Sequence, residues 1–276
     1  MTQATPGSAA AASEQGFEFV RYEKKGHVAY VTINRPERNN ALHAHAFAEL
    51  RRCWLDMARD KDIYVGIVTG EGHAFCGGMD VKFLAEHHAT NTLTPMDDPN
   101  HELYQVRRLR MPAEVGLDKP LIAAINGLAV GAGLSLALQC QLRVMADDAW
   151  LGDQHTNVGR LGPAHQFYAK LPHATAAYLT LCNGRLTAAE CLQQGIVNKV
   201  VPGSEVLRAA EEMAEMVTRA APRAVQAAVR LYRLADQNPV LTDYASHLNT
   251  DISEGEDVRE GPRAFKERRA PVWTGR

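Results

Sequence analysis

The chain has no strong excess of charge of either sign. Its 276 residues carry 30 Lys and Arg against 32 Asp and Glu, which gives a formal net charge of −2. Nucleic acid is therefore not an expected partner, because its binding depends on basic residues that neutralise phosphates. Long apolar runs are also missing, since charged or polar residues interrupt each candidate before the ~20 residues that would span a bilayer. No membrane segment is expected.

Cysteine is scarce and has no pattern. The five thiols form no Cys-x-x-Cys pair and stand in apolar surroundings: Cys53, Cys76, Cys140, Cys182 and Cys191. An odd, scattered set indicates reduced thiols in a cytoplasmic protein and argues against a disulfide framework. A signal peptide is not expected either, because residues 1–16 lack a basic start and a long apolar stretch. This segment, rich in Ala, Ser, Thr and Pro, is predicted to be a flexible tail.

Hydrophobic periodicity organises the chain that follows. Alternation over 17–22 and 27–34, on either side of a polar turn at 23–26, predicts a hairpin. A helical period over 44–60 then predicts an amphipathic helix, and an apolar run over 63–70 predicts a buried strand. The order strand, strand, helix recurs without a repeat in the residues themselves. These patterns together predict an α/β fold.

The periodicity changes toward the end of the chain. From about residue 204 the sequence becomes Ala-rich and charged, with helical periods over 206–220 and 223–234. We therefore divide the chain into the tail, an α/β core at 17–203 and a helical region at 204–276.

Two glycine-rich segments, at 73–82 and 126–135, carry the clearest chemical signal. The second follows an apolar strand-like run at 120–125 and leads into a buried helix, whose first N–H groups lack partners within the helix. An oxyanion held between the amides of Met79 and Ala132 would meet fixed donors, and the loss of one such donor costs roughly 3–4 kcal/mol of transition-state stabilisation. Either turn alone is more typical of a tight connection. Their conjunction predicts an oxyanion hole.

The same segments resemble a known family. The residues at 74–82, 119–127 and 131–136 resemble the enoyl-CoA hydratase/isomerase (crotonase) superfamily, as do those at 31–42 and 259–269. The resemblance covers nearly the whole chain after about residue 17. It implies a crotonase-like spiral of ββα units, followed by a helical region that packs subunits into trimers, often paired as hexamers.

The resemblance also implies a substrate and its contacts. The substrate is a small-molecule CoA thioester whose carbonyl oxygen accepts from Met79 and Ala132, and no metal or other cofactor is required. The family usually has Gly at position 132, but Ala keeps the amide donor. The matching positions imply the following substrate-binding residues: Arg35, Asn40, Ala41, Leu42, Gly78, Asp80, Lys82 and Gly131, with Phe265 and Arg268 reaching in from a neighbouring subunit.

The acid–base groups depart from the family pattern. Family hydratases carry two glutamates beside the hole, and the matching positions here hold Ser135 and His155. Ser135 is similar to the serine of the hydroxycinnamoyl-CoA hydratase-lyases, although those relatives keep the second glutamate. The pair of Asp153 and His155 resembles the Asp-x-x-His pattern of the camphor-diketone hydrolases, but here one residue separates the two.

Elementary chemistry supports a catalytic pair. An imidazole titrates near pH ~6.5, and a neighbouring carboxylate can fix its tautomer and stabilise the imidazolium. Residues at i and i+2 lie on the same face of an extended segment, so Asp153 can contact His155. The alternative is that His155 fills a pocket and Asp153 caps a turn. Cys76 as a nucleophile is disfavoured, and His43, His45, His165 and His173 are interpreted as structural.

Three functions follow from these observations. The first is an acyl-CoA hydratase or hydratase-like lyase that works through an enolate held by Met79 and Ala132. The second is a hydrolase that cleaves a carbon–carbon bond of a β-diketone with His155 and Asp153. The third is a non-catalytic acyl-CoA-binding protein that keeps the scaffold without the glutamates. Turnover assays and dependence on CoA distinguish them.

Overall fold

The structure is a computed structural model that describes residues 16–80, 82–83, 95, 98, 100–107, 111–155, 164–235, 269 and 272–276. Of the tail predicted at 1–16, residues 1–15 lie outside the described residues, as do Phe265 and Arg268.

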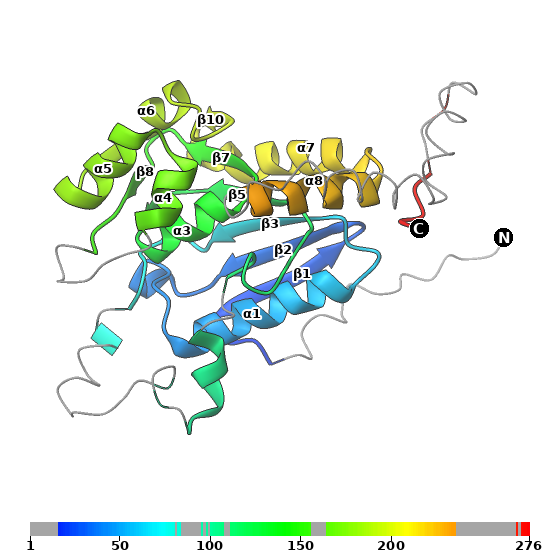
Figure 1. Cartoon of the computed structure of the whole chain (residues 1–276), viewed down its shortest axis with the longest axis horizontal. Helices are drawn as coiled ribbons and strands as arrows, with labels where there is room; N and C mark the ends of the chain where they lie inside the picture. Colours follow the sequence, from blue (N-terminus) through cyan, green and yellow to red (C-terminus); the bar gives the residue numbers. More distant parts are fainter. Residues whose placement is uncertain are drawn as a thin grey trace.

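A six-stranded sheet forms the larger layer, with strand order β1-β2-β3-β5-β7-β10 (Figure 1). The strands are β1 (Val20–Lys25), β2 (Val28–Ile33), β3 (Val65–Gly70), β5 (Leu121–Ile125), β7 (Leu142–Ala146) and β10 (Lys199–Val201). The first two are antiparallel, which confirms the predicted hairpin, and the others pair in parallel. Every residue of β5 is buried, as expected for a parallel strand in the interior of an α/β protein.

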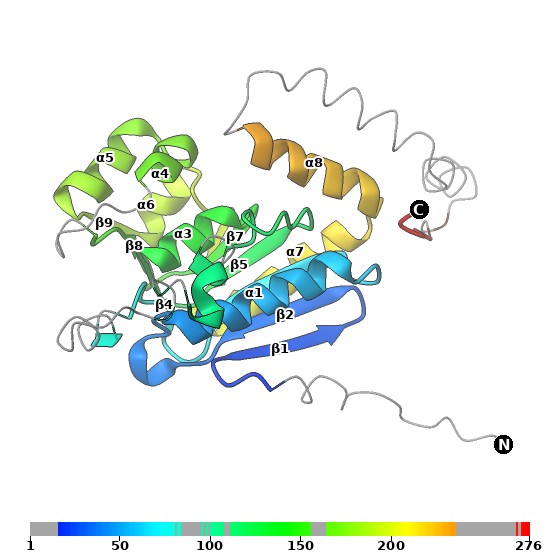
Figure 2. The same ribbon diagram turned by 60° about the horizontal axis from the view of Figure 1, so that its bottom comes forward.

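Helices pack on this sheet. Helix α1 (Ala44–Arg59) contacts β1 and β2, while α7 (Val206–Thr218) contacts β3, β5 and β7 (Figure 2). The face that α1 turns inward carries Phe47, Leu50 and Trp54, each fully buried. The helical period predicted over 44–60 is therefore confirmed, because it marks one buried stripe of a surface helix.

A smaller four-stranded sheet positions the candidate site. Its order is β4-β6-β8-β9, from β4 (Ala74–Cys76), β6 (Leu128–Val130), β8 (Trp150–Gly152) and β9 (Arg185–Thr187). β4, β6 and β8 are parallel, and β9 is antiparallel to β8. Because parallel strands end at the same edge of a sheet, the residues that follow β4, β6 and β8 come together.

The remaining helices connect and cover these strands. They are α3 (Ala132–Gln139), α4 (Ala164–Lys170), α5 (His173–Cys182), α6 (Ala188–Gln193) and α8 (Pro222–Ala235), with short 3₁₀ helices at Pro36–Arg38, Glu102–Arg107 and Gly203–Glu205. The helices predicted over 206–220 and 223–234 are confirmed as α7 and α8. Within the described ranges, no helix is both long and apolar enough to cross a membrane.

Candidate active site

The two glycine-rich segments meet beside a short parallel bridge. Leu42 donates its N–H to the carbonyl of Gly78 at 2.7 Å and accepts from the N–H of Asp80 at 2.9 Å. These bonds flank Met79 and leave its own N–H unused. Ala132 is the first residue of α3, so its N–H has no acceptor inside the helix. Among the described residues, no hydrogen bond uses either amide.

Glycine allows the two amides to approach each other. A Cβ placed on Gly78 would lie 2.9 Å from the carbonyl oxygen of Val130 and 3.6 Å from the nitrogen of Ala132. Gly78 also has a φ of 95°, which other residues rarely adopt. A Cβ on Gly133 would lie 2.2 Å from the carbonyl oxygen of Cys76, so the first turn of α3 packs directly on β4. The backbones that carry Met79 and Ala132 therefore lie side by side.

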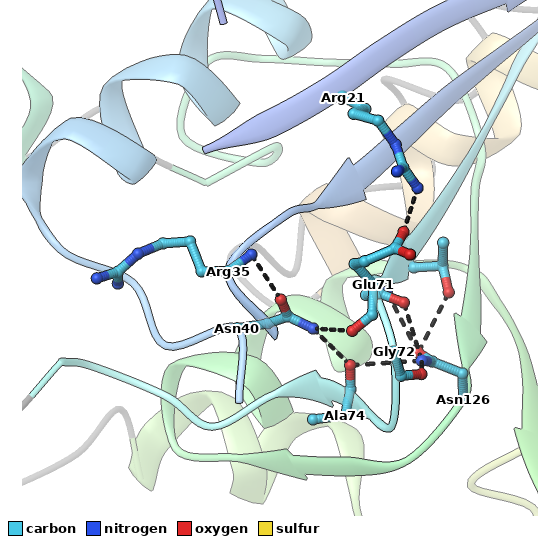
Figure 3. Close-up of polar contacts among 9 residues, drawn as sticks. Arg21, Arg35, Asn40, Glu71, Gly72, Ala74 and Asn126 are labelled. Carbon is cyan, nitrogen blue, oxygen red and sulfur yellow. Dashed lines mark hydrogen bonds and ion pairs between the residues drawn. The ribbon is translucent and has the colours of Figure 1, made fainter. Parts of the chain in front are cut away.

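Two asparagines hold the turn that leads into β4 (Figure 3). Asn126 donates to the carbonyls of Gly70 and Gly72 at 2.9 and 2.8 Å. Asn40 donates to the carbonyls of Glu71 and Ala74 at 2.9 and 2.7 Å. The side chain of Asn40, predicted to contact substrate, thus binds the protein itself. Its backbone N–H is also used, because it donates to the carbonyl of Arg35 at 2.8 Å. The predicted contact of Asn40 with substrate stays a prediction.

A buried ion pair anchors the other side of Met79. Arg35 Nη2 lies 2.9 Å from Asp80 Oδ2, and the two side chains are 9% and 8% exposed. Burial alone would raise the pKa of Asp80, but the N–H of Phe83 and the Arg35 guanidinium hold that pKa below its usual value. Arg35 also donates to the carbonyl of Ala41. The guanidinium therefore has partners within the protein, and its predicted contact with CoA phosphates stays a prediction.

The predicted contact between Asp153 and His155 is present. Nδ1 of His155 is hydrogen-bonded to Oδ1 of Asp153, whose side chain is 2% exposed. The backbone N–H of His155 approaches the same oxygen at 3.4 Å. No hydrogen bond among the described residues uses the second ring nitrogen, Nε2. The pair therefore presents one buried carboxylate to the inner nitrogen and leaves the outer nitrogen for a proton-transfer partner.

Strand pairing brings this pair to the glycine-rich turn. Gly131 donates its N–H to the carbonyl of Gly152 at 3.0 Å, in the register that continues from β6 and β8. A Cβ on Gly131 would lie 3.3 Å from Cε1 of His155 and 3.8 Å from its Nε2. The imidazole thus packs against the residue that precedes Ala132. The geometry places an imidazole next to the residue whose N–H begins α3.

Ser135 lies one helical turn beyond Ala132 on α3. Its N–H bonds to the carbonyl of Gly131 at 2.9 Å, as expected for the first turn of a helix. The residue is 4% exposed, and its Oγ has no hydrogen-bond partner among the described residues. A buried hydroxyl without a partner costs about 1–3 kcal/mol, so this oxygen is suited to bind a ligand or a water molecule.

A ring cluster that the sequence did not predict lies beside the Met79 loop. His43 caps α1 by accepting from the N–H of Ala46 at 3.1 Å, which confirms a structural role at this position. Its ring meets Phe19 edge-on at 4.5 Å and Phe83 at 5.5 Å between centroids. Burial, helped by the charge of Arg35, lowers the pKa of His43 to about 4. No spacing signal connects these three residues, because they come from separate segments.

The other predicted residues differ in how far they are exposed. Ala41 is partly buried, Leu42 is fully buried and Lys82 is exposed. Cys76 is fully buried, and burial raises the pKa of its thiol to about 12, so it does not form the thiolate that a nucleophile requires. Within the described ranges, no group of three or more His, Cys, Asp or Glu could hold a metal ion.

A substitution at Gly131 tests whether the imidazole of His155 packs against this residue. The change Gly131→Ala is expected to lower turnover at least about tenfold, because the new methyl group would push against the imidazole and misplaced catalytic groups lose rate steeply. Steady-state kinetics would measure the loss. Gly26→Ala is the matched control: its φ of 56° is nearly that of Gly131 at 55°, but its Cβ would meet nothing within 4 Å. Equal activities of the two variants would contradict a catalytic need for the packing of His155 against Gly131.

The chain matches known proteins over nearly its whole length. Residues 23–276 match the family model described as Enoyl-CoA hydratase/isomerase. The (E)-benzylidenesuccinyl-CoA hydratase of Thauera aromatica is 35% identical over 262 residues, which cover 93% of this chain and 99% of that protein. The carnitinyl-CoA dehydratase of Salmonella typhi is 32% identical, with 94% and 99% covered. A solved enoyl-CoA hydratase from Mycobacterium tuberculosis has a TM-score of 0.83 at 30% identity, with 94% and 99% covered.

Proposed function

Because the chain belongs to the enoyl-CoA hydratase/isomerase family, we propose that it adds water to an unsaturated acyl-CoA, or removes water in the reverse direction. The family resemblance seen in the sequence and the crotonase-like α/β fold are both confirmed. The observation that carries the proposal is the position of His155, whose imidazole packs on Gly131 next to the amide of Ala132. A hydratase and a dehydratase among the relatives support the same chemistry.

In the proposed reaction, the thioester oxygen accepts from the amides of Met79 and Ala132. As water adds to the β-carbon, negative charge collects on this oxygen and forms an enolate. Fixed donors stabilise that charge without reorganisation, and the N-terminus of α3 adds a favourable dipole. The substrate supplies CoA, and no further cofactor takes part.

His155 moves the proton in this proposal. Its Nε2 takes a proton from water while the water oxygen bonds to the β-carbon, and the imidazolium then returns a proton to the α-carbon. Asp153 holds the proton on Nδ1 and stabilises the imidazolium, as a buried carboxylate can. Ser135 orients the water through its unpartnered Oγ. One water is consumed, and no net proton is gained or lost.

The oligomer belongs to the same proposal. A trimer, or a dimer of trimers, would let Phe265 and Arg268 of a neighbour complete the CoA site, as the family resemblance implies. The proposal does not specify the acyl group of the substrate. The substrates in the names of the two relatives are the first candidates to assay.

Turnover assays test the proposal against its alternatives. Incubation with a panel of enoyl-CoA esters should give products heavier by one water, with CoA still attached. The pair of Asp153 and His155, with His155 at the position of a family glutamate, favours one rival, a carbon–carbon bond hydrolase, which would cleave a β-diketone without CoA. Tight binding of acyl-CoA with no conversion of either class would instead support a non-catalytic protein. Either result would overturn the proposal that this protein is a hydratase.

A further inference from the structure

The segment that carries the catalytic pair has two different faces. Asp153 and His155 bond each other, and the imidazole packs against Gly131. Gln154, between them, bonds the carbonyl of Asn183 instead. A Cβ on Gly152 would lie 3.4 Å from the carbonyl oxygen of Gly184, so Gly152 and Gln154 both face the turn at 183–184. The second side has no role in the proposed chemistry.

The turn between α5 and β9 contacts this second side through a hydrogen bond to Gln154. Gln154 Nε2 donates to the carbonyl oxygen of Asn183 at 3.0 Å. Asn183 ends α5 in the left-handed region, with a φ of 51°, so its carbonyl has a fixed direction. A Cβ on Gly184 would lie 2.2 Å from the ring of Tyr178, which shows how closely the end of α5 packs on the turn.

The strand pair supports the same contact. β8 and β9 are antiparallel with Gly152 opposite Arg185, and the Arg185 guanidinium lies 4.1 Å from the centre of the Trp150 ring. A Cβ on Gly152 would lie 2.8 Å from that ring, so Trp150 folds over the glycine. Figure 2 shows α5, β8 and β9 together at one end of the molecule. Gln154, the neighbour of His155 in sequence, therefore links the proposed base to the end of α5.

We propose that Gln154 is a positioning residue for His155, which holds the imidazole against Gly131 by tying the strand end to Asn183. The inference rests on the proposed function, since it assumes that His155 moves the proton. Among the described residues, the hydrogen bonds of Asp153 Oδ1 go to the ring and the N–H of His155, so the pair forms a small local unit. The amide of Gln154 fixes that unit to a second element of the fold.

The change Gln154→Leu removes the donor and keeps a similar volume. It is expected to lower kcat by about 10-fold to 10²-fold with KM nearly unchanged, because a base displaced by a fraction of an ångström loses rate while the binding contacts remain. Gln194→Leu is the matched control. Gln194 accepts a hydrogen bond from the hydroxyl of Thr175 in the first turn of α5, at 2.5 Å, and no hydrogen bond among the described residues joins it to β8. This control should keep the parental kcat.

A double-mutant cycle separates positioning from a general structural effect. If Gln154 acts through His155, Gln154→Leu should cost nothing further in a His155→Gln background, whereas an independent effect would multiply. A multiplied loss, or a parental kcat in Gln154→Leu, would overturn the inference. If His155→Gln itself has no effect, the proposed function fails rather than the anchor alone. Gln154→Met, which is unbranched and also lacks the donor, replaces Gln154→Leu should the latter not fold.

Discussion

The variant His155→Gln is expected to turn over acyl-CoA about 10²–10⁴-fold more slowly than the native protein, with little change in substrate affinity. Glutamine keeps much of the size of the imidazole and one hydrogen bond to Asp153 but cannot exchange a proton near neutral pH. Steady-state kinetics on the native protein and the variant would measure kcat and KM separately.

Two further variants provide a weaker case and a control for that result. Asp153→Asn should show a smaller loss of the same kind, because Asp153 orients and stabilises the imidazole without receiving the substrate's proton. His173→Gln serves as the control, since His173 lies at the exposed start of α5 against Tyr168. If both His155→Gln and Asp153→Asn keep full activity on the true substrate, the base lies elsewhere, and Ser135 becomes the next candidate.

The variant Ala132→Pro is expected to abolish measurable turnover, because proline removes the amide that the oxyanion would accept from. Loss of one such donor typically costs about 10²–10³ in kcat. Position 132 is the first of α3, where proline is better tolerated than anywhere else in a helix, so the loss should not come from the helix itself. Rates with a saturating acyl-CoA would measure the effect.

The control for this variant is Ala132→Gly, which keeps the amide and removes only the methyl group. Turnover should fall far less in Ala132→Gly than in Ala132→Pro. Thermal unfolding of each variant would show whether the fold is retained. A folded Ala132→Pro protein that works at the native rate would rule out this amide as an oxyanion donor.

Much of the fold follows from local patterns in the sequence. Alternation identified the β1–β2 hairpin, and the helical period identified α1, because each element buries one face against the sheet. The spacing of Asp153 and His155 permitted their contact. It gave no information on the third partner, Gly131, which depends on the pairing of β6 with β8.

Contacts between distant segments could not be predicted in the same way. The family resemblance implied that Arg35 and Asp80 bind substrate, but nothing in the sequence paired them with each other; the bridge between Leu42 and Met79 brings their segments together. The ring cluster of Phe19, His43 and Phe83 depends on the same loop. Such contacts carry no periodicity, since their partners lie in separate elements. The structure therefore adds the positioning of the site rather than its chemistry.

The most direct test of the account uses isotopically labelled water with an enoyl-CoA substrate and mass analysis of the products. The native protein should place one labelled oxygen on the β-carbon of a product that still carries CoA, and His155→Gln should do so at least about 10²-fold more slowly. Label in a free carboxylate, with release of CoA or cleavage of a carbon–carbon bond, would contradict the account. Equal rates of labelling in the native protein and His155→Gln would contradict it as well.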